Sequence, residues 1–254
     1  MKRLFALLCL FALPSALTAQ NIWHPKPGTS WQIQFAGDIN TTVDASMYDI
    51  DLFETPQSTI DALHAAHRIV ICYTSIGSYE NYRPDAAKFP PALLGLSNGW
   101  PGEKWLDIRG LDQLKPIFAA RLDLAVSKHC DGVDPDNMDG YTNKTGFPLT
   151  AADQLTYNRW FATQAHARHL AVGLKNDIAQ AKDLVADFDF EINEQCQQYH
   201  ECDTLKPFID AGKPVFAIEY NGDPTRVCAQ GNALNFDTLI KHLKLDAWRQ
   251  PCRK

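Results

Sequence analysis

Eight short runs rich in β-branched and aromatic residues recur along this 254-residue chain, and segments with helical spacing separate most of them. Strands that alternate with helices are typical of a parallel sheet, because each crossover connection carries a helix. A doubly wound open sheet is the alternative, but no Gly-rich phosphate loop follows the first run. We therefore predict a single-domain (β/α)8 TIM barrel over residues 20–254. The predicted strands are residues 31–35, 47–53, 68–75, 104–108, 132–134, 170–175, 188–192 and 214–220, and the predicted helices are residues 58–67, 111–129, 151–169, 205–211 and 236–245.

The first 19 residues have the pattern of a secretory signal peptide. Lys2 and Arg3 form a basic start, residues 4–13 are an apolar run, and mostly small residues lead to a predicted cleavage after Ala19. The apolar run is too short to span a bilayer, which takes about 20 residues. We expect a secreted protein, extracellular or periplasmic in a Gram-negative bacterium, with no membrane partner once residues 1–19 are removed.

The charge balance excludes a nucleic-acid partner. Removal of the leader, with Lys2 and Arg3, lowers the basic count from 24 to 22 against 30 acidic residues, for a formal net charge of −8. A basic footprint for phosphates is absent. An acidic surface attracts cations, so a cationic substrate is compatible with this composition.

Six cysteines remain after the leader, and an even number in an exported protein favours disulfides. We predict that Cys196 pairs with Cys202 and that Cys228 pairs with Cys252. Cys72 and Cys130 lie in or beside apolar strands, where we expect buried, reduced thiols.

Residues 131–141 form the most acidic stretch, with carboxylates at Asp131, Asp134, Asp136 and Asp139. A calcium-binding EF-hand loop requires an oxygen ligand at position five and Gly at position six. Counted from Asp134, those positions hold Met138 and Asp139, so the spacing does not fit. A solvated acidic turn remains an alternative, but crowded carboxylates at a strand end favour a catalytic site.

Polar or charged side chains occur at nearly every predicted strand end. In a parallel barrel these ends meet at one face, where the chemistry takes place. A satisfied ion pair could explain any single position, but eight such positions favour a polar ligand cavity. The loop over residues 79–103 is long and aromatic, so it either lines a sugar-binding cleft or packs on itself. The strand-end residues are Asp38, Asp49, Asp51, Tyr73, Ser75, Tyr79, Glu80, Asp107, Arg109, Asp134, Asp136, Lys175, Asn176, Asp177, Glu191, Asn193, Glu194, Glu219, Tyr220 and Asn221.

Two carboxylates that flank a glycosidic bond suffice for its hydrolysis. We assign this pair to Asp136 and Glu194, because alternate strands of a barrel contribute side chains to the same layer. Asp134 and Glu191 are the rival choices. The chain has no Gly-x-Ser-x-Gly elbow, no His-Glu-x-x-His motif and no P-loop. We expect neither a metal nor a cofactor.

Six segments, in order, resemble glycoside hydrolase family 114, the endo-α-1,4-polygalactosaminidases. They are WQIQF at 31–35 with Asp38, YDIDLF at 48–53, WLDIR at 105–109, DGVDPDNMDGY at 131–141, GLKND at 173–177 and NEQC at 193–196. The resemblance covers essentially the whole mature chain.

This resemblance implies a (β/α)8 barrel that cleaves α-1,4-linked galactosamine polymers, so its partner would be a polysaccharide rich in galactosamine. It also implies a retaining route with Asp136 as nucleophile and Glu194 as acid/base. We expect a monomer. The residues implied in sugar binding are Asp38, Tyr73, Asp107, Asn137, Asp139, Lys175, Asp177 and Tyr220.

Two other functions are compatible with the sequence. The domain could be a non-catalytic barrel that binds a polysaccharide, although the presence of both carboxylates argues against this. It could also hydrolyse another α-linked polysaccharide.

Overall fold

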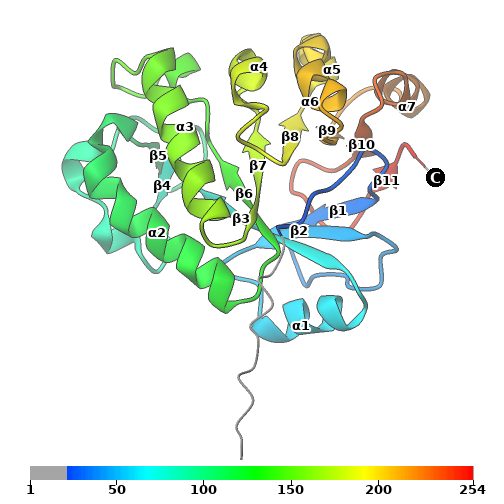
Figure 1. Ribbon diagram of the computed structural model, residues 1–254, viewed down its shortest axis with the longest axis horizontal. Helices are drawn as coiled ribbons and strands as arrows, with labels where there is room; N and C mark the ends of the chain where they lie inside the picture. Colours follow the sequence, from blue (N-terminus) through cyan, green and yellow to red (C-terminus); the bar gives the residue numbers. More distant parts are fainter. Residues whose placement is uncertain (1–21, 254) are drawn as a thin grey trace, which may run out of the picture.

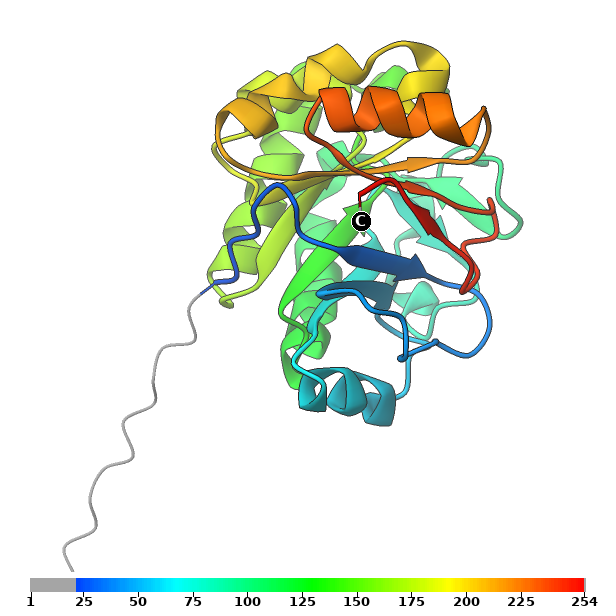
Figure 2. The same cartoon turned by 90° about the vertical axis from the view of Figure 1, so that its right-hand side faces the viewer.

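The computed structural model describes residues 22–253, and the predicted leader, residues 1–19, lies outside the described residues. A sheet of nine strands curls around a central axis with the helices outside it (Figures 1 and 2). Its first eight strands pair in parallel and the ninth is antiparallel, which confirms the predicted parallel α/β architecture. In sheet order the strands are β1 (Trp31–Gln34), β2 (Met47–Asp51), β3 (Ile69–Ser75), β6 (Gly132–Asp136), β7 (Ala171–Lys175), β8 (Phe190–Glu194), β9 (Val215–Glu219), β10 (Asp237–Ile240) and β11 (Gln250–Pro251).

The eight parallel strands are largely buried on both faces, and their side chains alternate between two apolar clusters. The inner cluster fills the barrel and includes Trp31, Phe190 and Phe216. The outer cluster lies under the helices and takes the intervening strand positions, among them Tyr48 and Val133. Successive side chains of a strand point to opposite faces. This alternation decides which polar strand-end residues can reach the central cavity.

The helices cover the outer cluster. The capping box at the start of α3 pairs Thr150 with Asp153, each side chain bonding the other residue's backbone N–H.

Within residues 22–253, no helix is long and apolar enough to cross a membrane. The helices are α1 (Gln57–Ala65), α2 (Leu111–Ser127), α3 (Ala151–His166), α4 (Ala181–Leu184), α5 (Cys196–Tyr199), α6 (Lys206–Asp210) and α7 (Pro224–Ala233).

The barrel closes between β1 and β10, the first and last parallel strands, without a regular ladder of backbone hydrogen bonds. The Trp31 indole donates a hydrogen bond to the Asp237 carbonyl at 2.7 Å. At the end of β1, the Phe35 and Ala36 N–H groups both donate to the Leu245 carbonyl, at 2.9 and 3.2 Å. The loop after β10 therefore closes the top of the barrel beside β1.

Two predicted elements were wrong. Residues 104–108 do not enter the barrel, because β5 (Glu103–Trp105) pairs with β4 (Ser78–Glu80) in a separate two-stranded sheet. Residues 236–245 contain β10 rather than a helix. The apolar spacing of residues 236–245 fits a helix. These residues nevertheless form a strand, because β10 pairs with β9 and places Leu239 in the inner cluster. The eighth barrel strand is thus β10.

The structure contains three disulfides. The predicted pairs Cys196–Cys202 and Cys228–Cys252 are confirmed. The prediction that Cys72 and Cys130 are free thiols was wrong, since they form a disulfide with a Cα–Cα distance of 6.0 Å. Cys72 lies on β3 and Cys130 lies just before β6, and these strands are neighbours in the sheet although 58 residues separate the two cysteines.

Candidate active site

A cleft of about 530 Å³ opens at the carboxyl ends of the barrel strands. Its volume falls within the usual range of small-molecule sites, roughly 300–1,000 Å³. Five residues predicted for the site line it together: Tyr73 on β3, Asp136 on β6, Lys175 on β7, Glu194 on β8 and Tyr220 just after β9. Alternation brings them inward, because each is an even number of positions from an inward-facing residue of its strand.

Lys175 lies at the floor of the cleft between the two proposed catalytic carboxylates. Its Nζ is 3.8 Å from an oxygen of Asp136 and 4.0 Å from an oxygen of Glu194. A third carboxylate, Asp134, lies beneath it at 3.5 Å. Burial alone would lower the pKa of Lys175, but the surrounding carboxylates outweigh burial and raise the pKa well above its usual value. Lys175 is therefore an ammonium that holds both carboxylates in place.

Asp136 accepts two further hydrogen bonds through Oδ2. The Tyr73 hydroxyl donates at 2.9 Å and the Asn137 side-chain amide at 3.2 Å. Asn137 is held in turn by Ser75, whose Oγ accepts from the same amide at 2.9 Å. Asn137 adopts a left-handed backbone conformation, with φ of 63°, which ends β6 and turns its amide back toward Asp136. Two donors and a nearby ammonium suit a carboxylate that attacks as an anion.

Glu194 has a different set of partners. The Tyr220 hydroxyl donates a hydrogen bond to Oε1 of Glu194. The Glu194 backbone N–H donates to Oδ1 of Asn176 at 2.9 Å, which fixes the end of β8. Each proposed catalytic carboxylate thus has its own tyrosine, and both share Lys175.

The rival carboxylates lie outside the cleft. Asp134 is fully buried one layer below Asp136, and burial raises its pKa to about 6. Glu191 is also fully buried, and it faces away from the barrel interior because its neighbours Phe190 and Ile192 both face inward. Burial likewise raises the pKa of Glu191 well above its usual value. Neither group lines the cleft, which favours Asp136 and Glu194 as the reacting pair.

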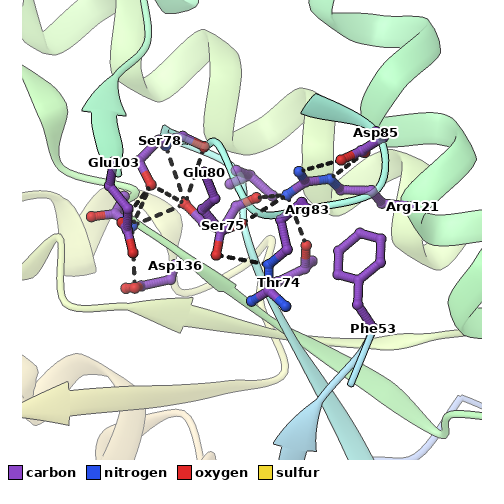
Figure 3. A network of polar contacts seen from close by, with 12 residues as sticks. Phe53, Thr74, Ser75, Ser78, Glu80, Arg83, Asp85, Glu103, Arg121 and Asp136 are labelled. Carbon is purple, nitrogen blue, oxygen red and sulfur yellow. Dashed lines mark hydrogen bonds and ion pairs between the residues drawn. The ribbon is translucent and has the colours of Figure 1, made fainter. Parts of the chain in front are cut away.

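A buried network beside the cleft holds the loop after β3 (Figure 3). The Arg83 guanidinium binds both oxygens of Asp51, at 2.9 and 2.6 Å, and Glu80 at 2.9 Å. Arg121 from α2 reaches the Ser75 carbonyl at 2.6 Å and Asp85 at 2.8 Å. These contacts fix the segment that presents aromatic side chains to the cleft.

The aromatic loop is divided between the cleft and the core. Tyr82 and Trp100 are exposed and line the cleft, whereas Phe89 and Trp105 are buried. Glu103, which also lines the cleft, accepts a hydrogen bond from the Tyr82 hydroxyl at 2.8 Å. The loop therefore contributes some aromatic side chains to the cleft and others to the core.

Several residues of the cleft and its surroundings were absent from the predicted site. Arg83 and Glu103 line the cleft and were missed. Arg121, which lies in the buried network beside the cleft, was also missed, although it interrupts the apolar face of α2 and so offered a signal in the sequence. The residues that follow β10 were missed because the segment was predicted to be helical; they are Leu243, Lys244 and Leu245.

Three predicted sugar-binding residues line neither the cleft nor the pocket beside it: Asp38, Asp107 and Asn137, which instead donates a hydrogen bond to Asp136. Asp38 is exposed in a turn beyond the end of β1, where its carbonyl accepts from the Gln34 side chain at 2.9 Å. Asp107 follows β5, outside the barrel, and binds Arg109 through two hydrogen bonds of 2.7 Å. Asp139 and Asp177 line an adjoining pocket that shares Glu194 and Gln195 with the cleft.

Known proteins resemble this chain in sequence and in fold. The chain is 44% identical to Ega3 of Aspergillus fumigatus, whose crystal structure was determined in complex with galactosamine; the match covers 91% of this chain and 98% of that one, with a TM-score of 0.86. The glycoside hydrolase domain of PelA from Pseudomonas aeruginosa shares the fold at 12% identity, with coverage of 87% and 97% and a TM-score of 0.68. An uncharacterized protein of Deinococcus radiodurans is 27% identical over 78% of this chain and 76% of its own length.

The profile of glycoside-hydrolase family GH114 matches residues 12–254, nearly the full length. The resemblance found in the sequence motifs is thereby confirmed, and with it the expectation of a glycoside hydrolase. This chain belongs to glycoside-hydrolase family GH114.

Proposed function

We propose that the protein is a secreted, endo-acting hydrolase of α-1,4-linked galactosamine polymers. Family membership supports glycoside hydrolysis, and the similarity to Ega3 in complex with galactosamine supports the sugar. The observation that carries the proposal is the placement of Asp136 and Glu194 around one ammonium at the floor of an open cleft. An open cleft suits cleavage within a chain, because both ends of the polymer can extend beyond the site.

The surroundings of the two carboxylates support a retaining mechanism with distinct roles. Asp136, oriented by Tyr73 and Asn137, attacks the anomeric carbon and forms a glycosyl ester. Glu194, in its protonated form, gives its proton to the leaving oxygen as the glycosidic bond breaks. Glu194 then removes a proton from water, which attacks the anomeric carbon and releases Asp136 as a carboxylate. Tyr220 orients Glu194 for both proton transfers.

The stereochemistry of the product tests this mechanism. In an NMR time course on deacetylated α-1,4-galactosamine oligomers, the α-anomer should appear first and mutarotate later. Initial release of the β-anomer would contradict a covalent intermediate on Asp136.

Reducing-end release on a panel of α-linked polymers tests the substrate. Galactosamine polymers should give the highest rate, with products of intermediate length from the earliest time points. Binding without release of reducing ends would favour a non-catalytic barrel that binds a polysaccharide. Faster release from another polymer would favour a hydrolase of another α-linked polysaccharide.

Export of the chain is part of the proposal. The three disulfides suit an oxidising compartment, and the leader pattern over residues 1–19 supplies the signal. N-terminal sequencing of protein collected outside the cytoplasm should begin at Gln20. The expected monomer should elute near the size of one chain in size-exclusion chromatography.

A further inference from the structure

A chain of buried hydroxyl groups runs beside the proposed nucleophile, Asp136 (Figure 3). Ser75, the last residue of β3, and Ser78, the first residue of β4, are both fully buried. Their Oγ atoms lie 2.7 Å apart, and Ser78 Oγ lies 3.2 Å from Oε2 of Glu103 at the wall of the cleft. At the other end, the side-chain amide of Asn137 lies 2.9 Å from Ser75 Oγ. We call Asn137, Ser75, Ser78 and Glu103, in this order, the hydroxyl chain.

The donors around Ser75 fix the direction of the hydrogen bonds in the hydroxyl chain. A serine oxygen has two acceptor positions and one proton to donate. Ser75 Oγ accepts from the Asn137 amide and from the backbone N–H of Ser78, at 2.9 and 3.1 Å. Its own proton goes to Ser78 Oγ, because that oxygen at 2.7 Å is nearer than the Ser78 carbonyl at 3.5 Å. Ser78 then donates its proton to Glu103, because a carboxylate only accepts.

Glu103 is a fixed end point for the hydroxyl chain. Its Oε2 also accepts from the Asn98 side chain at 2.7 Å, and its Oε1 accepts from the Tyr82 hydroxyl at 2.8 Å. Hydrogen bonds to a charged group are stronger than those between neutral groups, and successive hydrogen bonds polarise one another. The negative charge of Glu103 therefore stabilises this order of protons and makes Ser75 a better acceptor for the Asn137 amide.

The other end of the hydroxyl chain controls how Asn137 meets Asp136. The two N–H groups of a side-chain amide lie in one plane, so holding one of them fixes the direction of the other. Asn137 gives one N–H to Ser75 and turns the second toward Oδ2 of Asp136, at 3.2 Å. Without the serines the amide could turn by half a rotation and place its carbonyl oxygen against the carboxylate, where the two acceptors repel each other.

The turn between β3 and β4 also holds the backbone at this position. The N–H groups of Ile76 and Gly77 both donate to the Asp136 carbonyl, at 3.0 and 3.2 Å. A Cβ atom on Gly77 would lie 1.7 Å from the Asn137 carbonyl oxygen, so this close approach requires glycine. Backbone and side-chain contacts from one turn therefore converge on Asp136 and Asn137.

We propose that Ser75 and Ser78 are positioning residues for Asp136, which they hold through Asn137, and that Glu103 sets the direction of their hydrogen bonds. The inference rests on the proposed function, in which Asp136 is the nucleophile. Neither serine lines the cleft, so each acts on the reaction only through the residues that it holds. The amide and the Tyr73 hydroxyl both occupy Oδ2 of Asp136, which leaves Oδ1 as the attacking oxygen.

A double-mutant cycle tests whether Ser78 acts through Asn137. On deacetylated α-1,4-galactosamine polymer, Ser78→Ala should lower kcat/KM about tenfold. Asn137→Gly removes the amide but accepts the positive φ of this position, and it should lower kcat/KM about thirtyfold. The double variant should match Asn137→Gly alone, because Ser78 then has no amide to hold.

Two results of this cycle would overturn the inference. Losses that multiply to about 300-fold in the double variant would show that the two residues act independently, as a general effect on the fold would. A Ser78→Ala variant with the kcat/KM of the wild type would show that the hydroxyl chain does not position Asp136.

A matched serine pair provides the control. Ser30 Oγ and Ser46 Oγ lie 3.0 Å apart, and the Ser46 backbone N–H donates to Ser30 Oγ at 3.0 Å, but this pair precedes β1 and β2 and does not line the cleft. Ser46→Ala should keep kcat/KM within about twofold of the wild type, as exposed substitutions usually do. A tenfold fall in this control would overturn the inference, because loss of a serine pair outside the cleft would then have the same effect.

Glu103→Gln tests the far end of the hydroxyl chain, and it keeps the test open if Ser78→Ala does not fold. This substitution preserves shape and removes the charge, so kcat/KM should fall about threefold in the wild-type background. It should have no effect in the Asn137→Gly background. An equal fall in both backgrounds would show that Glu103 acts on the substrate directly and would overturn its place in the hydroxyl chain.

The outcomes separate this inference from the proposed function. If the wild-type protein cuts no galactosamine polymer, the proposed function fails. If it cuts the polymer but the losses in the cycle multiply, only the positioning role of the hydroxyl chain fails.

Discussion

Lys175 supports both proposed catalytic carboxylates from a fully buried position at the end of β7. Its ammonium lies within 4.0 Å of Asp134, Asp136 and Glu194, which come from two strands on either side of β7. The same ammonium faces the Tyr73 ring at 5.9 Å. The carboxylates around Lys175 therefore offset its repulsion of a cationic sugar in the cleft.

The proposed catalytic pair gives the first prediction at this scale. Asp136→Asn and Glu194→Gln should each lower kcat by roughly 10²–10⁴ because each removes a carboxylate that we propose takes part in the reaction. Folding should change little, since both substitutions keep shape, and circular dichroism together with thermal unfolding provides the check. Near wild-type turnover in either variant on deacetylated polymer would show that the residue is assigned wrongly.

The two buried aspartates below the cleft give a second prediction, because their charge states differ. Burial, followed by the charge of Asp134, raises the pKa of Asp49 well above its usual value, and neither of its carboxyl oxygens has a partner in the described chain. In the unfolded chain Asp49 loses its proton near pH 4, whereas in the folded protein it keeps the proton to higher pH. Stability is therefore lost as pH rises above about 4. Asp49→Asn should remove this loss and raise Tm at pH 7, with a smaller gain at pH 4.

Asp134→Asn should raise stability at pH 7 by less than Asp49→Asn does. Burial raises the pKa of Asp134 only to about 6, so the stability lost between about pH 4 and pH 6 is smaller, and the Lys175 ammonium at 3.5 Å loses a partner in this variant. Urea unfolding at pH 4 and pH 7 measures both variants, and a larger gain at pH 7 for Asp134→Asn than for Asp49→Asn would contradict this difference between the two aspartates.

At the scale of elements, the disulfides tie together parts of the barrel that are distant in sequence. Cys72–Cys130 joins β3 to the start of β6 across 58 residues, whereas Cys196–Cys202 closes a loop of only 6. The longer connection contains β4, β5 and α2, the elements that carry the aromatic wall of the cleft. Its cross-link restricts the unfolded chain more than the short one does.

This difference in loop length gives the prediction at the element scale. Replacing both Cys72 and Cys130 with Ala should lower the free energy of unfolding by about 4 kcal/mol, and the same change at Cys196 and Cys202 by about 2 kcal/mol, from loop-closure entropy. Urea unfolding of the two double variants provides the measurement, with peptide mapping of the wild type as control. Free thiols at Cys72 and Cys130 in the folded wild type would contradict the structure.

At the scale of the whole molecule, the acidic charge acts on the substrate before it reaches the cleft. The chain has an excess of acidic over basic residues, and the residues that line the cleft and the pocket beside it include Glu54, Glu103, Asp139 and Glu201. A free-amine polymer is cationic at neutral pH, whereas its N-acetylated form is not. Long-range attraction should therefore favour the deacetylated polymer.

Salt and pH should weaken this preference. Exposed charges are screened beyond about 10 Å at 0.1 M salt, so the ratio of initial rates on deacetylated and acetylated polymer should fall as ionic strength rises. It should fall again at high pH, where the amine loses its proton. A ratio unaffected by salt would show that the carboxylates act through hydrogen bonds and shape alone.

The sequence by itself determined the alternation of strands and helices and the inward direction of Asp136 and Glu194. Both follow from local chemistry, since β-branched and aromatic runs favour strands and a strand's period of two decides which side chains share a face. With the strand assigned, Asp136 points inward because Asp134 and Gly132 do, and Glu194 points inward because Ile192 does.

Only the tertiary structure decided which strands are neighbours and what the polar groups meet there. Residues 236–245 have helical spacing, yet pairing with β9 makes part of them a strand. The spacing of Cys72 and Cys130 says nothing of the contact between β3 and β6 that joins them. The place of Lys175 among three carboxylates likewise depends on the sheet order. Strand pairing depends on the burial and hydrogen bonding of the whole barrel. A local sequence pattern therefore does not specify which strands become neighbours.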